Sequence, residues 1–345
     1  MFKKFQDKLE RLIQNQKPFL LFRKPNSTQV ELWENKSLES ANKFICNSFD
    51  NTKLIEFNDD EVIEISIDEL PNFELSLPES DQNEAISYEN YINLIQKTVQ
   101  ELQSDSPTKK IVISRINSLP ETNINLVETF KNLHQHYPNA YVYLRFDAEE
   151  GCWIGASPEL LLKENNQFIQ TVSLAGTKAK EDEWTEKEYH EQQVVTDYIS
   201  STLEPYTSYI DVDGPFSVNA GFFEHLKSFI SAQLKDKSQL YDLLKALHPT
   251  PAVGGMPKDL SKDFILKNEG YDRTFYAGFM GFQNKTESEY FVNLRCAKIF
   301  SNKVNLYVGG GIMPDSIPEN EWRETELKSK TIGELLVKSN LKNNL

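Results

Sequence analysis

Residues 274–311 read TFYAGFMGFQNKTESEYFVNLRCAKIFSNKVNLYVGGG, and this stretch decides the fold. Its apolar runs near 274–283, 289–300 and 303–309 are rich in aromatic and β-branched residues, and polar turn residues separate them. Strands joined by such short turns pair as antiparallel neighbours. We therefore predict three consecutive antiparallel strands here.

Elsewhere the chain shows further strands in runs, with helices that do not alternate regularly with them. This order favours the α+β class over a doubly wound fold. A nucleotide site has no support, because no G-x-G-x-x-G follows a strand and no Walker loop is present. We expect strands near 110–117, 140–147, 151–156, 167–174, 207–212 and 226–234, and helices near 91–102, 124–136, 184–204, 238–247 and 319–337.

The first 85 residues are less clearly patterned. Apolar residues at helical spacing predict an opening helix over residues 2–12. Brief strands are expected at 19–22, 53–57 and 62–67. Residues 72–85 are acidic and polar, which is typical of a loop or internal linker.

Composition narrows the functional class. The chain has 345 residues and a formal charge of 37 − 52 = −15, which disfavours nucleic acid and anionic membranes as partners. The three cysteines show no metal-ligand spacing and no disulfide framework, as in a reducing compartment. No stretch reaches the roughly 18 apolar residues of a membrane span. We expect a soluble, cytoplasmic protein that binds neither nucleic acid nor membrane.

The 319–337 helix begins its inward face with charged side chains. Glu321, Glu324 and Lys328 fall on the same face as the apolar Ile332 and Leu335. A stripe that enters the core should not start with charges unless a partner compensates them. The alternative is a first turn whose glutamates stabilise the helix dipole.

The 184–204 helix has the same feature. Glu191 leads a face with Val194, Val195, Tyr198 and Thr202. Two helices that each direct a carboxylate inward suggest Mg²⁺, which commonly takes one or two protein carboxylates. A solvated helix surface is the alternative.

Cations and glycines accompany these carboxylates. Lys110 begins a strand, where it is either an exposed edge lysine or a functional group. Arg295 is expected in the middle of a strand, where an arginine either pairs with a structural carboxylate or binds a ligand carboxylate. Gly309–Gly311 end a strand and would allow a ligand to approach the backbone.

Glu159 follows Ser157 and Pro158, which could open a turn or short helix, and precedes three leucines. Partial burial at the edge of the core would raise its pKa and suit the carboxyl group to donate a proton. The alternative is a first-turn glutamate that stabilises a helix.

Together these segments resemble the chorismate-utilising enzyme family. The resemblance runs from about residue 86 to 337, and it rests on several strings that occur in family order. They are Lys110–Arg115 (KIVISR), Gly155–Leu162 (GASPELLL), Leu174–Thr177 (LAGT), His248–Ala252 (HPTPA), Tyr271–Arg273 (YDR), Arg295–Lys298 (RCAK), Gly309–Ile312 (GGGI) and Glu321–Thr325 (EWRET).

The resemblance implies one domain over residues 1–345, with 1–85 as a divergent N-terminal part and 86–337 as the catalytic region. It also implies the family fold of large, mostly antiparallel sheets with flanking helices. Chorismate would be the substrate, Mg²⁺ the cofactor and a monomer the working form.

The resemblance also implies roles for individual residues. Lys110 matches the lysine that activates water, and Glu159 matches the acid that protonates the departing hydroxyl. Glu191 and Glu324 match magnesium ligands, and Glu321 matches a carboxylate that holds the metal directly or through water. The matches to substrate-binding positions are Arg295, Lys328, Gly309, Gly311, Gly176, Thr177 and His225.

Within the family, Lys110 favours water over ammonia as the nucleophile, because ammonia-using members carry glutamine there. The HPTP string at His248 resembles the group that forms isochorismate, and a salicylate-forming enzyme is the alternative. Two features depart from the family pattern: residues 253–257, and Gln192 and Gln193 in place of a histidine–glutamate pair. Menaquinone and siderophore pathways both start from isochorismate, so the pathway stays open.

Overall fold

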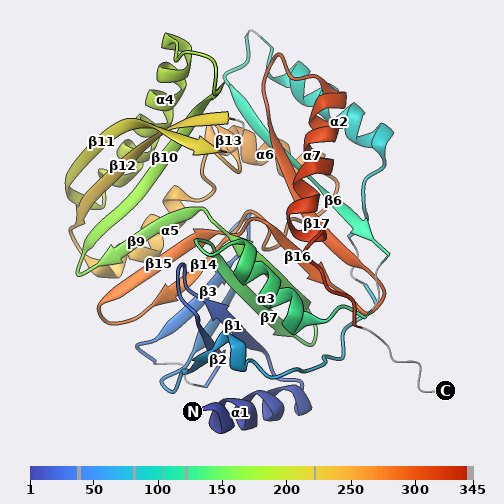
Figure 1. Cartoon of the computed structure of the whole chain (residues 1–345). Helices are drawn as coiled ribbons and strands as arrows, with labels where there is room; N and C mark the ends of the chain where they lie inside the picture. Colours follow the sequence, from blue (N-terminus) through green and yellow to red (C-terminus); the bar gives the residue numbers. More distant parts are fainter. Residues whose placement is uncertain (37–39, 81–82, 104, 121–122, 221–222, 340–345) are drawn as a thin grey trace.

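The computed structural model describes residues 1–345 except 37–39, 81–82, 104, 121–122, 221–222 and 340–345. Its described part contains two large antiparallel sheets, and helices pack around them (Figure 1). The expected α+β class with mostly antiparallel sheets is confirmed.

The first sheet has nine strands. Toward one edge it holds β6, β17 and β16, which carry or adjoin most of the candidate site. In spatial order the strands are β13 (Gly255–Met256), β6 (Lys110–Leu119), β17 (Val304–Ile312), β16 (Cys296–Ile299), β8 (Gly151–Ser157), β7 (Tyr141–Asp147), β1 (Phe19–Arg23), β2 (Gln29–Glu34) and β5 (Ile63–Ser66).

The second sheet has eight strands, and long β10, β11 and β12 form one end of it. In spatial order the strands are β11 (Thr207–Ala220), β12 (Phe223–Leu234), β10 (Phe168–Ala179), β9 (Leu160–Asn165), β15 (Glu287–Val292), β14 (Phe279–Gln283), β3 (Lys43–Asn47) and β4 (Leu54–Asn58).

The helices cover the sheets and their ends. In Figure 1, α7 and α2 lie side by side along β17, and α4 lies beside β10. The helices are α1 (Phe2–Gln14), α2 (Tyr88–Glu101), α3 (Leu126–His136), α4 (Glu186–Leu203), α5 (Leu240–Leu247), α6 (Lys258–Asn268) and α7 (Pro318–Gly333), with 3₁₀ turns η1 (Ile67–Glu69) and η2 (Lys237–Gln239).

The main apolar core lies between the two sheets. Phe22 of β1 packs its ring 5.0 Å from that of Phe44 on β3, and Tyr141 of β7 stacks at 4.7 Å on Phe291 of β15. A second core lies on the other face of the first sheet, against α1 and α3. The first sheet is therefore packed against apolar side chains on both of its faces.

The 274–311 stretch forms two hairpins in different sheets. β14 pairs with β15 in the second sheet, and β16 pairs with β17 in the first. The predicted antiparallel pairs are therefore right, but the run over 289–300 is not one strand. The chain crosses between the sheets at residues 293–295, and the expected position of Arg295 in the middle of a strand is wrong.

Arg295 occupies the left-handed region, with φ 47°, because the backbone must turn between the sheets there. Asn293 holds the crossing in place: it donates a hydrogen bond to Phe275 O at 2.9 Å and accepts one from Tyr143 Oη at 2.9 Å. Because apolar residues lie on both sides of the crossing, the sequence predicted one continuous strand there.

Several elements were not expected from the sequence. They are β2, β3, β9, β13 and α6. β9 and β3 lie inside the second sheet with apolar positions on both faces, so they show little alternation. α6 has only two buried residues, Ser261 and Ile265, which gives it a weak apolar stripe.

The first 85 residues contribute to both sheets. The predicted opening helix is α1, and the strands expected at 19–22, 53–57 and 62–67 correspond to β1, β4 and β5. Between 72 and 85 the described residues form no helix or strand, as expected. The division into a divergent part and a catalytic region stays a prediction. None of the described helices is long and apolar enough to cross a membrane.

Candidate active site

Lys110 and Gly311 meet on neighbouring strands. β17 pairs antiparallel with β6, which places Gly311 opposite Val112. A Cβ atom on Gly311 would lie 2.7 Å from Lys110 Cε and 3.3 Å from Nζ. The lysine side chain therefore lies across the glycine backbone, and any larger residue at 311 would displace it.

Burial lowers the pKa of Lys110 below its ordinary value, and the positive charge of Lys328 lowers it further. Glu159 and Glu191 oppose this shift by attracting the ammonium. A lysine with a lowered pKa has a larger neutral fraction near neutral pH, which a general base requires. Lys110 is thus more than an exposed strand-edge lysine.

Glu159 lies in the link between β8 and β9. Neither a turn nor a helix follows Ser157, so the prediction of a turn or short helix is wrong: Leu160 begins a strand that pairs with β10 and β15. Burial raises the pKa of Glu159 to about 7, and the charge of Lys110 opposes that rise. The carboxyl group is therefore partly protonated near neutral pH and can act as an acid.

The first two turns of α7 direct carboxylates at β17. A Cβ atom on Gly310 would lie 3.1 Å from Glu321 Oε2 and 3.7 Å from Glu324 Oε1. Burial raises the pKa of Glu321, and the neighbouring negative charge of Glu324 adds to the rise. These two carboxylates repel each other, and Gly310 beside them has no side chain. The arrangement is suited to bind a cation.

Lys328 lies one turn further along α7. Its Nζ is 2.6 Å from Glu324 Oε1 and donates to Gly309 O at 2.9 Å. The structure thus brings together four of the candidate site residues, Glu321, Glu324, Lys328 and Gly309.

Arg115 fixes α7 on the sheet. Its guanidinium lies 3.7 Å from the centre of the Trp322 ring, and Arg115 Nε donates to Thr325 Oγ1 at 2.8 Å. It also forms an ion pair with Glu326. The helix ends at Gly333, earlier than expected, so Leu335 belongs to the segment that follows it.

Glu191 on α4 is partly exposed. The buried face of α4 consists of Gln192, Thr196, Ile199 and Leu203, one residue further along than expected. The prediction that Glu191 leads the inward stripe is therefore wrong: it lies at the edge of that stripe. Its electrostatic interaction with Lys110 still places it on the side of α4 that faces the site.

Gln192 explains the shift of this face. Its side chain accepts from Ala175 N at 2.7 Å and donates to Ser173 Oγ at 2.8 Å and Ser228 Oγ at 3.0 Å. These bonds join α4 to β10 and β12. Sequence reasoning noted Gln192 only as a departure from the family pattern and did not predict this buried network.

Gly176 and Thr177 of β10 lie together with His225 of β12. β10 bulges between Ala175 and Thr177, and Thr177 lies opposite His225 on β12. Thr177 Oγ1 is 2.9 Å from His225 Nδ1, and the same nitrogen is 3.4 Å from Gly176 O. Gly176 has φ +71°, and a Cβ atom there would lie 2.8 Å from Glu188 O on α4.

Arg295 is exposed, and its guanidinium lies 5.0 Å from the centre of the Tyr137 ring. Its carbonyl accepts from Ala156 N, near Glu159. Tyr137 Oη donates to Thr331 O, one turn beyond Lys328 on α7. Within the described residues, no hydrogen bond or ion pair joins Arg295 to another candidate.

The carboxylates fit a hard divalent cation by their chemistry. Glu191, Glu321 and Glu324 offer oxygen ligands, and bare Gly310 leaves room beside two of them. In the described part of the chain, no three acidic, histidine or cysteine side chains already converge as a closed metal site. Sequence reasoning included Gly310 in the glycine run but did not predict its contact with the two carboxylates.

Comparison with known proteins agrees with this geometry. The family model described as "Chorismate binding enzyme" matches residues 26–337. Isochorismate synthase DhbC of Bacillus subtilis is 32% identical over 267 residues, which cover 71% of this chain and 67% of that protein. Isochorismate synthase MenF of Escherichia coli is 32% identical over 287 residues, covering 79% of this chain and 65% of that protein.

A solved structure shows the same fold. It is the putative 2,3-dihydroxybenzoate-specific isochorismate synthase DhbC from Bacillus anthracis, with a TM-score of 0.75 and 24% identity. The match covers 94% of this chain and 98% of that one. The chain belongs to the chorismate-binding enzyme family, and its similarity to isochorismate synthases confirms the resemblance seen in the sequence. It spans about two thirds of the length of the two curated relatives.

Proposed function

We propose that the protein is an isochorismate synthase, an enzyme that converts chorismate reversibly to isochorismate with Mg²⁺ as cofactor. The observation that carries this proposal is the electrostatic pairing of Lys110 with Glu159. It supports the assignment of a base and an acid, with oppositely shifted pKa values, to one site. The curated relatives that bear this name support the same activity.

The acid and the base have separate tasks. Neutral Lys110 takes a proton from water, whose oxygen then bonds to the ring. Protonated Glu159 gives its proton to the C4 hydroxyl, which leaves as water with the electron pair of its bond to carbon. One water molecule is added and one is released, so substrate and product have the same composition and the reaction is an isomerisation.

Burial is the main cause of both pKa shifts, and it acts in opposite directions on the two groups. It disfavours the charged ammonium of Lys110 and the charged carboxylate of Glu159. One environment thus favours the neutral form of each residue, and those are the forms that the reaction needs.

Substrate binding needs concentrated positive charge, since chorismate is a dianion and the chain carries −15. We assign one carboxylate of the substrate to Lys328 and Arg295, with backbone N–H groups at Gly309 and Gly311. Gly176, Thr177 and His225 would line the opposite side. Arg295 must turn from Tyr137 toward the substrate, and its exposure leaves it free to do so.

Glu191, Glu324 and Glu321 are the residues that would hold Mg²⁺. When bound, the ion would neutralise the other substrate carboxylate and stabilise negative charge that develops during the reaction. The mutual repulsion of Glu321 and Glu324 supports this assignment.

Salicylate formation from chorismate, with release of pyruvate, is less well supported, because the curated relatives described above are named isochorismate synthases. A role in menaquinone or siderophore synthesis, a cytoplasmic location and a monomeric state complete the proposal. No residue of this chain favours one pathway over the other.

Product identification tests the proposal. The purified protein is incubated with chorismate and Mg²⁺, with and without ammonium, and the products are separated and identified by mass. Isochorismate in both incubations supports the proposal. Salicylate with pyruvate would replace it by the alternative, and anthranilate or an absence of turnover would contradict both.

A further inference from the structure

Arg145 is a buried cation. It lies on β7 and is 1% exposed, and its terminal nitrogens, Nη1 and Nη2, have no hydrogen-bond partner among the residues that the structure describes. Within the described residues, no carboxylate lies within 4.0 Å of its guanidinium. A guanidinium stays charged at any pH that a folded protein meets, so this charge cannot be removed by deprotonation.

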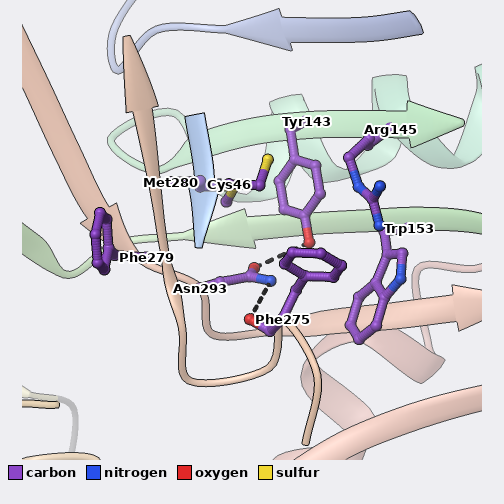
Figure 2. Close-up of a pocket in the computed structure, with 8 residues that line it drawn as sticks. All are labelled: Cys46, Tyr143, Arg145, Trp153, Phe275, Phe279, Met280 and Asn293. Carbon is purple, nitrogen blue, oxygen red and sulfur yellow. Dashed lines mark hydrogen bonds between the residues drawn. The ribbon is translucent and has the colours of Figure 1, made fainter. Parts of the chain in front are cut away.

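Trp153 presents a second unpaired donor beside it. Arg145 and Trp153 are directly opposite each other on β7 and β8, and in the described part of the chain Trp153 Nε1 also has no hydrogen-bond partner. Figure 2 shows both side chains projecting to the same side of the sheet, with the indole next to the guanidinium. Three N–H-bearing nitrogens therefore remain unsatisfied at adjacent positions.

A small cavity between the two sheets adjoins these donors. Its lining residues are Cys46, Tyr143, Arg145, Trp153, Phe275, Phe279, Met280 and Asn293, and its size is about that of one water molecule.

The other polar groups of the cavity do not compensate the charge. Tyr143 Oη donates to Asn293 Oδ1, and Asn293 Nδ2 donates to Phe275 O, so these groups are already paired (Figure 2). Burial raises the pKa of the Cys46 thiol to about 11, so the thiol is neutral. The Phe275 ring, 4.5 Å from the guanidinium carbon, offers only a cation–π contact.

We propose that this cavity binds a small monovalent anion of the halide class between the guanidinium of Arg145 and the indole N–H of Trp153. A halide accepts hydrogen bonds and needs no acceptor of its own, which matches a wall of unpaired donors. It also compensates the buried positive charge, whereas a water molecule would satisfy donors and leave the charge in place.

The anion would be structural. Arg145 lies in the core that joins the two sheets, and Trp153 stacks at 4.9 Å on Tyr307, which stacks at 5.5 Å on Tyr276. Halide binding to the folded state alone stabilises it by mass action. This site is independent of the proposed function, because none of its residues belongs to the candidate active site.

The test uses the full chain in halide-free buffer, with sodium gluconate holding the ionic strength constant. The melting temperature is measured while sodium bromide replaces gluconate. We expect a saturable rise in melting temperature with bromide. An equal melting temperature in the two salts at every concentration would overturn the proposal.

Two variants and one control make the test specific. Trp153→Phe keeps the ring but removes the donor, and we expect about a tenfold higher half-saturating bromide concentration. Arg145→Met should abolish the bromide response, while the exposed control Arg323→Met should retain it in full. A full response in both cavity variants would refute the site.

Crystals grown with bromide locate the ion directly. We expect an anomalous peak within hydrogen-bond distance of Arg145 Nη and Trp153 Nε1. Ordinary water density in the cavity, without an anomalous signal, would contradict halide binding even if bromide stabilised the protein at some other site.

Discussion

Lys328 Nζ lies 2.6 Å from Glu324 Oε1, so a proposed substrate-binding cation is paired with a proposed metal ligand. The two residues are one turn apart on α7, and Lys328 also donates to Gly309 O. Each group therefore has a protein partner before substrate and metal bind. When substrate and cation bind, this ion pair must break. Lys328 then pairs with the substrate carboxylate, and Glu324 binds the cation.

This exchange predicts opposite effects of Lys328→Met on the two ligands. Without substrate, freeing Glu324 should tighten Mg²⁺ binding by about two- to fivefold, because an exposed ion pair is weak. The KM for chorismate should rise about tenfold or more, because a charged partner of the substrate is lost. Calorimetry with Mg²⁺ and steady-state kinetics measure the two effects. Lys330→Met, an exposed lysine on the same helix, should change neither.

Lys110→Ala should lower kcat by about 100- to 10,000-fold, because the proposed base is removed. Chorismate should still bind, as measured by calorimetry, since Lys110 is assigned to proton transfer. The adjacent Lys109 is exposed and donates to Ser106 O, so Lys109→Ala is the matched control and should keep full activity. Comparable turnover in the Lys110 variant would remove its assigned role.

The pH profile of kcat/KM should be bell-shaped. Activity should rise with pH as Lys110 loses its proton, and it should fall as Glu159, with a pKa of about 7, loses its own. Glu159→Gln should lower kcat and remove the alkaline limb that reflects this carboxyl group. A variant profile that keeps the alkaline limb would assign it to a different residue.

Glu159 should also make stability depend on pH. Its pKa rises from 4.5 to about 7 on folding, so the folded state binds the proton more tightly. The stabilisation by this proton is complete below pH 4.5 and is lost as pH rises through 7. Glu159→Gln should therefore raise the free energy of unfolding by about 1–3 kcal/mol at pH 8. The gain should shrink toward pH 4.5 in urea titrations, and a gain independent of pH would contradict the shift.

Glu324→Gln should raise the Mg²⁺ concentration needed for half-maximal activity by about tenfold or more, because a charged oxygen ligand is lost. Glu319 lies in the first turn of the same helix and is exposed, so Glu319→Gln serves as its control. An unchanged magnesium requirement in the Glu324 variant would refute its role as a ligand.

Local patterns in the sequence predicted many elements of the fold. The apolar stripe of α2 and the alternation around β6 identified those elements, because burial on one face leaves a period in the sequence. The hairpins β14–β15 and β16–β17 were predicted from their turns. Their placement in different sheets was not, because the crossing at Arg295 depends on contacts of Asn293 with Phe275 and Tyr143, which are distant in the chain.

Prediction of the candidate site from the sequence was limited in a similar way. Motif order assembled Lys110, Gly311, Glu321, Glu324 and Lys328, and the structure brings these residues together. The position of Glu191 on the buried face of α4 was predicted wrongly, because the periodicity of the sequence does not distinguish two buried faces that differ by one residue. Hydrogen bonds between Gln192 and two strands decide that rotation, and a sequence pattern does not reveal such partners.

Water activation by Lys110 is the central claim, and a single-turnover reaction in oxygen-18-labelled water tests it most directly. Mass spectrometry of the product shows whether solvent oxygen enters the ring. We predict isochorismate with one oxygen-18 atom in its new hydroxyl group, and no labelled product from Lys110→Ala. Unlabelled isochorismate from the unaltered protein would contradict the account, because the hydroxyl would then have moved without attack by water.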